Sequence, residues 1–96
     1  MPHFLLIYRP PRPTFGKDAT PEEEGVIGAH FQYLKSLLAK GTLLIAGPCE
    51  DASMGIAIVE CEDEAAARKI LVEDPAVVGR VFTCEVKPYR VSLSKL

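Results

Sequence analysis

The stretch TPEEEGVIGAHFQYLKSLLAKGTLLIAGP, residues 20–48, has the pattern of one long helix followed directly by a strand. Thr20 suits an N-cap, Pro21 fills the first helical position, and Glu23 completes a capping box. Gly41 is a natural C-terminal stop. The segment therefore predicts a helix over 20–41 and a strand over 42–48. Between the caps, apolar residues recur at helical spacing, at Ile27, Phe31, Leu34 and Leu38, with Leu37 beside them.

Three further strands and a second helix complete the pattern. HFLLIY at 3–8 is a strand ended by proline, MGIAIVEC at 54–61 is another, and a last strand covers about 81–87 before a closing proline. EAAARKILVED at 64–74 is a helix capped by Asp63. The order β-α-β-β-α-β is the ferredoxin-like arrangement of the α+β class. It predicts a four-stranded antiparallel sheet with both helices on one face.

The predicted strands are apolar on both faces, although the helices cover only one. In the first strand Phe4, Leu6 and Tyr8 alternate with Leu5 and Ile7. A bare apolar face exceeds what a monomer usually exposes, so we expect a homodimer that packs sheet against sheet. The next two strands follow the same alternation, with Leu43 and Ile45 opposing Leu44 and Ala46, and Ile56 and Ile58 opposing Ala57 and Val59.

Length and composition indicate one ordinary domain covering residues 1–96. The chain has 48% hydrophobic residues and a net charge of -2, which give no reason to expect a nucleic-acid partner, since that would require a basic face. No apolar run approaches the roughly 20 residues of a membrane span, and no secretory signal is recognisable. We therefore expect a cytoplasmic protein. Its three cysteines lack metal or redox spacing and are expected to be free, buried thiols.

His30 and Asp74 are polar residues at positions where the pattern calls for apolar ones. His30 projects about 60° from Ile27, at the edge of the apolar stripe of its helix. Asp74 falls on the inner face of the second helix, at the C-terminal end, where the helix dipole disfavours a carboxylate. Each has an ordinary explanation: a buried histidine bonded to a backbone carbonyl or to water, and an Asp before Pro75 that caps a turn or starts the next short helix.

The two helices lie side by side in this fold, so each misplaced side chain is a possible partner of the other. A carboxylate that orients an imidazole suits general acid–base chemistry near neutral pH. No serine stands in a nucleophile-elbow context, so serine hydrolysis is not supported. No histidine cluster or other ligand set predicts a metal.

Candidate substrate-binding residues surround this pair. Tyr8 and Arg9 end the first strand, and Gly47-Pro48 ends the second, where glycine permits close approach of a ligand to the backbone; a simple strand-ending turn explains Gly47-Pro48 equally well. The proline-rich connection at 9–19 is long enough to be functional. Its basic residues Arg9, Arg12 and Lys17 are candidates for attracting an anionic substrate, although basic loop residues are mostly solvated.

The chain resembles the YciI-like, or YCII-related, family over nearly its whole length. The matching elements are FLLIY, the HFQYL of the first helix, GTLLIAGP, EAA, EDP and VKPY, in this order and spacing. Two features depart from the family pattern: the 9–19 connection is longer and richer in proline, and the segment from Cys49 to Ser53 is short.

The resemblance implies a dimeric α+β barrel, with His30 and Asp74 at the positions of the family's His and Asp. It also implies cofactor-independent lyase, isomerase or hydrolase chemistry on a small organic acid or lactone, as in similar muconolactone-processing proteins. His30 would be the general base or acid and Asp74 its orienting carboxylate. The competing hypothesis is a non-catalytic small-molecule binding or partner module of the same dimeric fold, since fold alone does not fix function.

Overall fold

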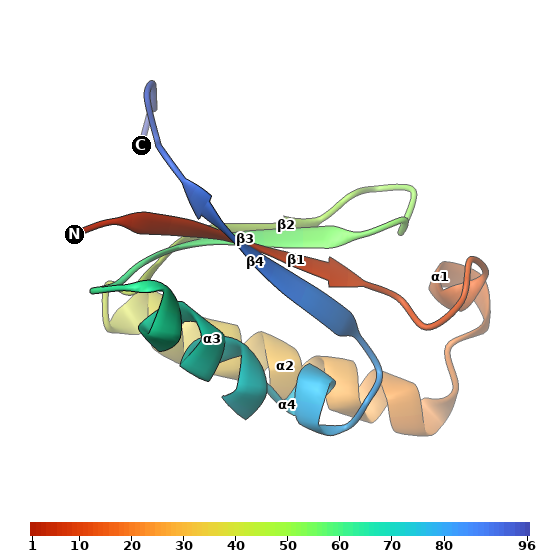
Figure 1. Ribbon diagram of the computed structural model, residues 1–96. Helices are drawn as coiled ribbons and strands as arrows, with labels where there is room; N and C mark the ends of the chain where they lie inside the picture. The colour runs from red at the N-terminus through yellow and green to blue at the C-terminus, as the bar shows by residue number, and fades with distance from the viewer.

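Four antiparallel strands form a single sheet in the order β2-β3-β1-β4 (Figure 1). The computed structural model describes residues 1–96. The ferredoxin-like α+β fold predicted from the sequence is confirmed, with helices on one face of the sheet. The strands are β1 His3–Arg9, β2 Leu43–Pro48, β3 Gly55–Glu60 and β4 Thr83–Tyr89.

Local capping residues fix both long helices, α2 Pro21–Ala39 and α3 Glu64–Glu73. The predicted capping box of α2 is present, because the Thr20 hydroxyl accepts from the Glu23 amide while the Glu23 carboxylate accepts from the Thr20 amide. Asp63 caps α3 by accepting from Ala66 N–H. After α2, Gly41 adopts a φ of 81°, a conformation that favours glycine.

Two short helices occur where the sequence predicts a loop and, after Asp74, a turn or a short helix. The 9–19 connection contains α1, Phe15–Asp18, and the turn after α3 forms α4, Pro75–Val78. The prediction of a plain loop over 9–19 was therefore wrong, and of the two alternatives for Asp74, a turn cap or the start of a short helix, the structure has the short helix. Both helices have only four residues, too short for a periodic apolar pattern to reveal.

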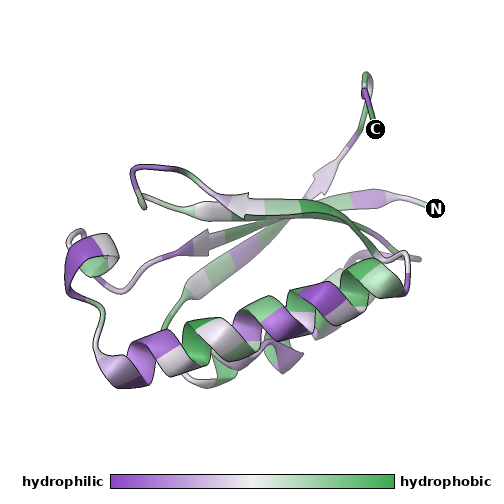
Figure 2. Cartoon of the chain, turned by 180° about the vertical axis from the view of Figure 1, so that it is seen from behind, coloured by the Kyte–Doolittle hydropathy of each residue, from purple (hydrophilic) through white to green (hydrophobic).

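The core lies between the sheet and the helices. Phe4, Leu6 and Tyr8 of β1 are buried there beside Ala57 and Val59 of β3, as the alternation predicts. The predicted apolar stripe of α2 is only partly buried. Leu37 is the only buried residue of α2, whereas Phe31 and Leu38 are 59% and 55% exposed. Figure 2 shows α2 crossing below the sheet, with hydrophobic residues both along the helix and in the strands.

Two strands differ in detail from the prediction. An irregularity in β2 between Leu43 and Ile45 shifts the register, so Leu43 pairs with Val59 while Ala46 pairs with Ala57. Leu43 and Ala46 therefore share the helix side, and the predicted face assignment of β2 was wrong. The last strand continues through Pro88 to Tyr89, because β4 is an edge strand, where a missing amide donor is tolerated.

The face of the sheet away from the helices carries an apolar patch. By register, Leu5 lies opposite Ile58 and Ile7 lies opposite Ile56 on this face. Ile45 of β2 pairs with Ile58 on the same face. We call these five residues the open-face patch. Within it Ile7 is buried, Leu5, Ile56 and Ile58 are half-buried, and Ile45 is exposed.

The cysteines form no disulfide, and their environments differ. Cys61 is buried and Cys84 is partly buried, but Cys49 is exposed. The prediction of burial was wrong for Cys49, because it lies in the connection between β2 and β3. None of the helices is both long enough and apolar enough to traverse a lipid bilayer.

Candidate active site

His30 and Asp74 meet between α2 and the junction of α3 with α4. The Nδ1 atom of His30 lies 2.8 Å from both carboxylate oxygens of Asp74. The His30 side chain is 13% exposed, and that of Asp74 is completely buried. The structure thus brings together the two residues that the sequence singles out as misplaced.

Pro75 determines where the Asp74 carboxylate lies. A residue before proline avoids helical geometry, and Asp74 accordingly has φ −70° and ψ 127°. It ends α3 and begins α4, with Oδ1 accepting from the Ala76 amide at 2.9 Å. Both explanations that the sequence left open are therefore correct: one carboxylate caps α4 and contacts His30.

Tyr33 of α2 further fixes the end of α3. Its hydroxyl donates to the carbonyl of Ile70 at 2.7 Å. This carbonyl is one of the last four of α3, which lack a normal helical partner, and the Asp74 amide bonds instead to Leu71 at 3.1 Å. Burial raises the pKa of Tyr33 to about 12, so the hydroxyl remains a donor at neutral pH. Tyr33 thereby ties α2, which carries His30, to the helix end that carries Asp74.

The contact with Asp74 leaves one nitrogen of His30 available. A buried carboxylate accepts, so Nδ1 carries the proton and donates to Asp74. In the neutral imidazole Nε2 then holds the lone pair, and no protein group bonds to this nitrogen. A carboxylate-oriented imidazole of this tautomer can take a proton from a bound molecule at Nε2 and later return it.

Aromatic rings enclose the imidazole. Tyr8, at the end of β1, meets the His30 ring edge to face, with the ring centroids 5.0 Å apart. Phe82 packs on His30 at 5.6 Å and on Phe15 of α1 at 5.9 Å. The sequence does not predict Phe15 or Phe82, because they are drawn from opposite ends of the chain and meet only in the folded protein.

The Tyr8 hydroxyl is the one buried side-chain oxygen without a hydrogen-bond partner. Burial, reinforced by the negative charge of Asp74, raises the pKa of Tyr8 well above its usual range. Tyr8 therefore stays neutral, and its proton is held close to the His30–Asp74 pair.

A cavity of about 760 Å³ opens between α2 and the β2–β3 side of the sheet. His30 and Tyr8 contribute to its lining, as do Gly47 and Pro48 at the end of β2. The rest of the lining is mainly apolar, and it includes the exposed Phe31 and Leu38 of α2, together with Leu34, Leu44, Met54 and Phe82. Phe31 and Leu38 are therefore exposed to a cavity that a small organic molecule could fill.

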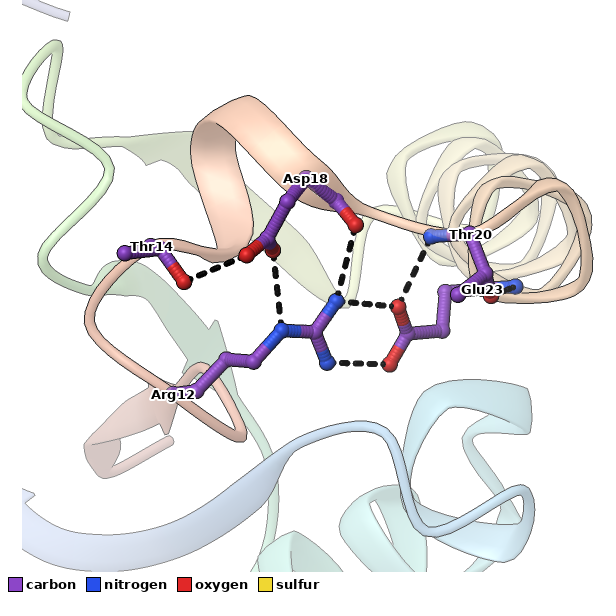
Figure 3. A network of polar contacts seen from close by, with 5 residues as sticks. All are labelled: Arg12, Thr14, Asp18, Thr20 and Glu23. Atoms are coloured by element: carbon purple, nitrogen blue, oxygen red, sulfur yellow. Dashed lines mark hydrogen bonds and ion pairs between the residues drawn. The ribbon is translucent and has the colours of Figure 1, made fainter.

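The arginines that the sequence proposes as substrate attractors are engaged elsewhere. Arg9 lies outside the cavity lining and forms an ion pair with Glu85. Arg12 donates both terminal nitrogens to Glu23, at 2.9 and 2.7 Å, and its Nε to Asp18 at 2.8 Å (Figure 3). Lys17 also does not line the cavity.

The Arg12 contacts form a clamp, which we define as Arg12, Asp18 and Glu23. Arg12, assisted by the Thr20 amide, lowers the pKa of Glu23 to about 2. The clamp ties the 9–19 connection to the start of α2, and within that connection Phe15 lines the cavity. Gly16 comes so close to the β2–β3 connection that a Cβ placed there would lie 2.6 Å from the Cβ of Ala52. The connection therefore forms an end wall of the cavity.

No group of three or more His, Cys, Asp or Glu side chains is arranged to hold a metal ion. The second histidine of the chain, His3, lies on β1 and pairs with Glu60 at 3.3 Å, away from the cavity lining.

The fold and the buried His–Asp pair beside an apolar cavity define a class of small ferredoxin-like α+β proteins with a candidate acid–base site. Comparison with known families makes the assignment specific: the YCII-related domain matches residues 1–90, and the chain belongs to this family. The predicted resemblance is thereby confirmed.

Among solved structures, the chain is similar to 5-chloro-2-hydroxyhydroquinone dehydrochlorinase from Burkholderia phenoliruptrix AC1100, in complex with 2,5-dihydroxybenzoquinone. The TM-score is 0.66 at 23% sequence identity, over 91% of this chain and 93% of that chain. At this identity the likeness establishes a shared fold. Comparison with curated proteins gives no match.

Proposed function

We propose that this protein is a cofactor-independent enzyme in which His30 and Asp74 perform acid–base chemistry on a small organic molecule bound in the cavity. The observation that carries the proposal is the bond from His30 Nδ1 to the buried Asp74 at the wall of an apolar cavity. Such a pair can transfer a proton without a metal or an organic cofactor, since the carboxylate stabilises the imidazolium that forms.

We favour an elimination or isomerisation adjacent to a carbonyl group. In an elimination, His30 Nε2 removes a proton from carbon, the C–H electrons form a new double bond, and the leaving group departs from the neighbouring carbon with its bonding pair. Solvent then takes the proton from the imidazolium. The similar fold of a dehydrochlorinase supports this lyase-type reaction, and the family resemblance extends the candidate substrates to small organic acids and lactones.

The proposed binding residues have unequal support. Tyr8, Gly47 and Pro48 line the cavity, and Tyr8 has an unpaired hydroxyl close to the His–Asp pair. Arg9 pairs with Glu85 outside the lining, so we assign it no contact with substrate. We further propose that the protein acts as a cytoplasmic homodimer. The open-face patch supports the dimer, and three free cysteines are typical of a reducing compartment.

The alternative is a non-catalytic binding module. One observation favours it: Asp74 already has a structural task as the cap of α4, which it would perform without any reaction. In that case replacing His30 would change ligand binding or stability, with no turnover to lose.

Turnover measurements on matched variants separate the two functions. The wild-type protein is assayed with 5-chloro-2-hydroxyhydroquinone for chloride release and with muconolactone for isomerisation. We expect His30→Gln to lower kcat about 100-fold or more, the usual effect of losing a general base. His3→Gln replaces the histidine outside the cavity and should leave kcat unchanged. Turnover that survives in His30→Gln would contradict the proposed function.

A further inference from the structure

Lys35 is the only fully charged side chain that lines the cavity. Asp and Glu are absent from the lining, and the other lining residues are apolar apart from the Tyr8 and His30 side chains. Lys35 forms no ion pair; instead its Nζ lies over the ring of Phe31, 5.7 Å from the centroid. An exposed ammonium on an otherwise neutral apolar wall is therefore free to meet an anion.

The geometry of α2 separates Lys35 from His30 by a defined apolar surface. Five helical residues correspond to a rise of about 7.5 Å and a rotation of about 140°. Leu34 and Phe31 project between these two directions and also line the cavity. His30 is on the buried edge of this surface and Lys35 on the exposed edge. A molecule lying across the surface would reach both the imidazole and the ammonium.

We propose that Lys35 binds an anionic oxygen of the substrate at the mouth of the cavity. The substrate class is then an organic anion with an apolar, ring-sized body, whose charged oxygen lies on the opposite side of that body from the carbon that His30 deprotonates. This inference rests on the proposed function, which identifies the part of the substrate next to His30 as the part that reacts.

The assignment also explains how an anion is selected while Arg9 and Arg12 are occupied by Glu85 and by the clamp. With no acidic group in the lining to compete for the ammonium, an incoming carboxylate can pair with Lys35 without displacing an internal partner.

Binding of two isosteric probes tests the proposal without requiring turnover. The 96-residue chain is titrated calorimetrically with 2-naphthoate and with the uncharged 2-naphthamide. We expect the wild type to bind naphthoate about tenfold more tightly than the amide, the scale of one charge-assisted hydrogen bond. Lys35→Met should weaken naphthoate binding about tenfold and leave naphthamide binding unchanged. Lys69→Met, an exposed lysine of α3 outside the cavity, is the matched control and should change neither.

Three results would overturn the proposal: no binding of naphthoate to the wild type, equal affinities of the wild type for the two probes, or an undiminished preference for naphthoate in Lys35→Met. The His30→Gln protein distinguishes this inference from the proposed function. If turnover survives in His30→Gln but the naphthoate preference still depends on Lys35, the catalytic assignment fails and the anion site stands. If turnover is lost but Lys35→Met keeps the preference, the anion site fails alone.

Discussion

At the scale of single residues, Asp74 shows how the fold can accommodate a carboxylate in its interior. Burying an unpaired charge is costly, so a completely buried Asp needs several donors. Asp74 receives the Ala76 amide and His30 Nδ1. The short helix α4 thus supplies a donor that offsets the unfavourable C-terminal end of α3.

Variants of Asp74 separate its structural role from its proposed catalytic one. Asp74→Asn keeps an oxygen to cap Ala76 but removes the charge, so we expect a stability loss of about 1 kcal/mol and nearly complete loss of turnover. Asp74→Ala removes the cap and the partner of His30, and should cost about 3 kcal/mol. Urea unfolding and kcat are measured on the same preparations.

Asp63→Ala is the matched control, because Asp63 caps α3 in the same way but contacts no histidine. It should cost about 1 kcal/mol and leave turnover intact. If Asp74→Asn instead behaves like Asp63→Ala, with full turnover, Asp74 is a cap and does not orient a catalytic base.

The sequence predicts the His–Asp pair because each residue contradicts the local pattern around it. An imidazole on an apolar stripe and a carboxylate at a helix C-terminus are visible without coordinates. The sequence does not reveal Phe15, Phe82 or Lys35 as site residues, because an aromatic residue or a surface lysine conflicts with no helix or strand pattern. Their roles depend on which cavity they border, and that is a property of tertiary packing.

At the scale of elements, the predictable features are those with local causes. The ends of α2 and α3 follow from caps within a few residues of each helix, and the structure has them close to where the sequence indicates. The irregularity in β2 has no such cause in LLIAG, and it shifts which residues face the helices. Likewise, the incomplete burial of α2 reflects the cavity that its residues line together with β2, and the periodicity of the sequence does not reveal a cavity.

At this scale the sequence-based prediction for Arg12 was wrong, because Arg12 bonds to Asp18 and Glu23 in the clamp and is not available to attract a substrate. The strength of the clamp should depend on pH in a definite direction. Glu23 has a folded pKa of about 2 against an ordinary value of 4.5. Because the folded pKa is lowered, the ionised clamp stabilises the protein fully above pH 4.5, and this contribution is lost as the pH falls through about 2.

Arg12→Met should therefore destabilise the protein at pH 7, and the difference from the wild type should shrink progressively between pH 4.5 and 2. Urea unfolding of both proteins at pH 7, 4 and 2 measures it. Arg68→Met, which removes an exposed pair with Glu64 within α3, is the control and should have little effect at any of these pH values. A difference for Arg12→Met that stays constant down to pH 2 would contradict the assigned linkage.

At the scale of the whole molecule, the open-face patch is unaccounted for by the isolated chain. The helices cover only one face of the sheet, yet Leu5, Ile56 and Ile58 on the other face are partly exposed, and Ile45 is 44% exposed. A chain of 96 residues buries only a limited fraction of its surface on folding, so covering this patch would add stability that the single domain lacks.

Ile58→Lys tests whether a second copy covers the patch. Ile58 lies on β3 between Leu5 and Ile45, so a lysine there places a charge in the middle of the proposed interface. We expect the wild type to sediment at twice the 10.5 kDa chain mass and the variant at the mass of one chain. Desolvating an unpaired ammonium in an apolar interface is the physical reason.

Val72→Lys makes a similar aliphatic-to-lysine change on the outer side of α3, where Val72 is 64% exposed, and should remain dimeric. The melting temperature adds a second readout, because a dimer becomes more stable as protein concentration rises, whereas the dissociated variant should melt at a fixed temperature. A wild type that sediments as one chain, or an Ile58→Lys protein that stays at twice the chain mass, would refute the sheet-to-sheet homodimer.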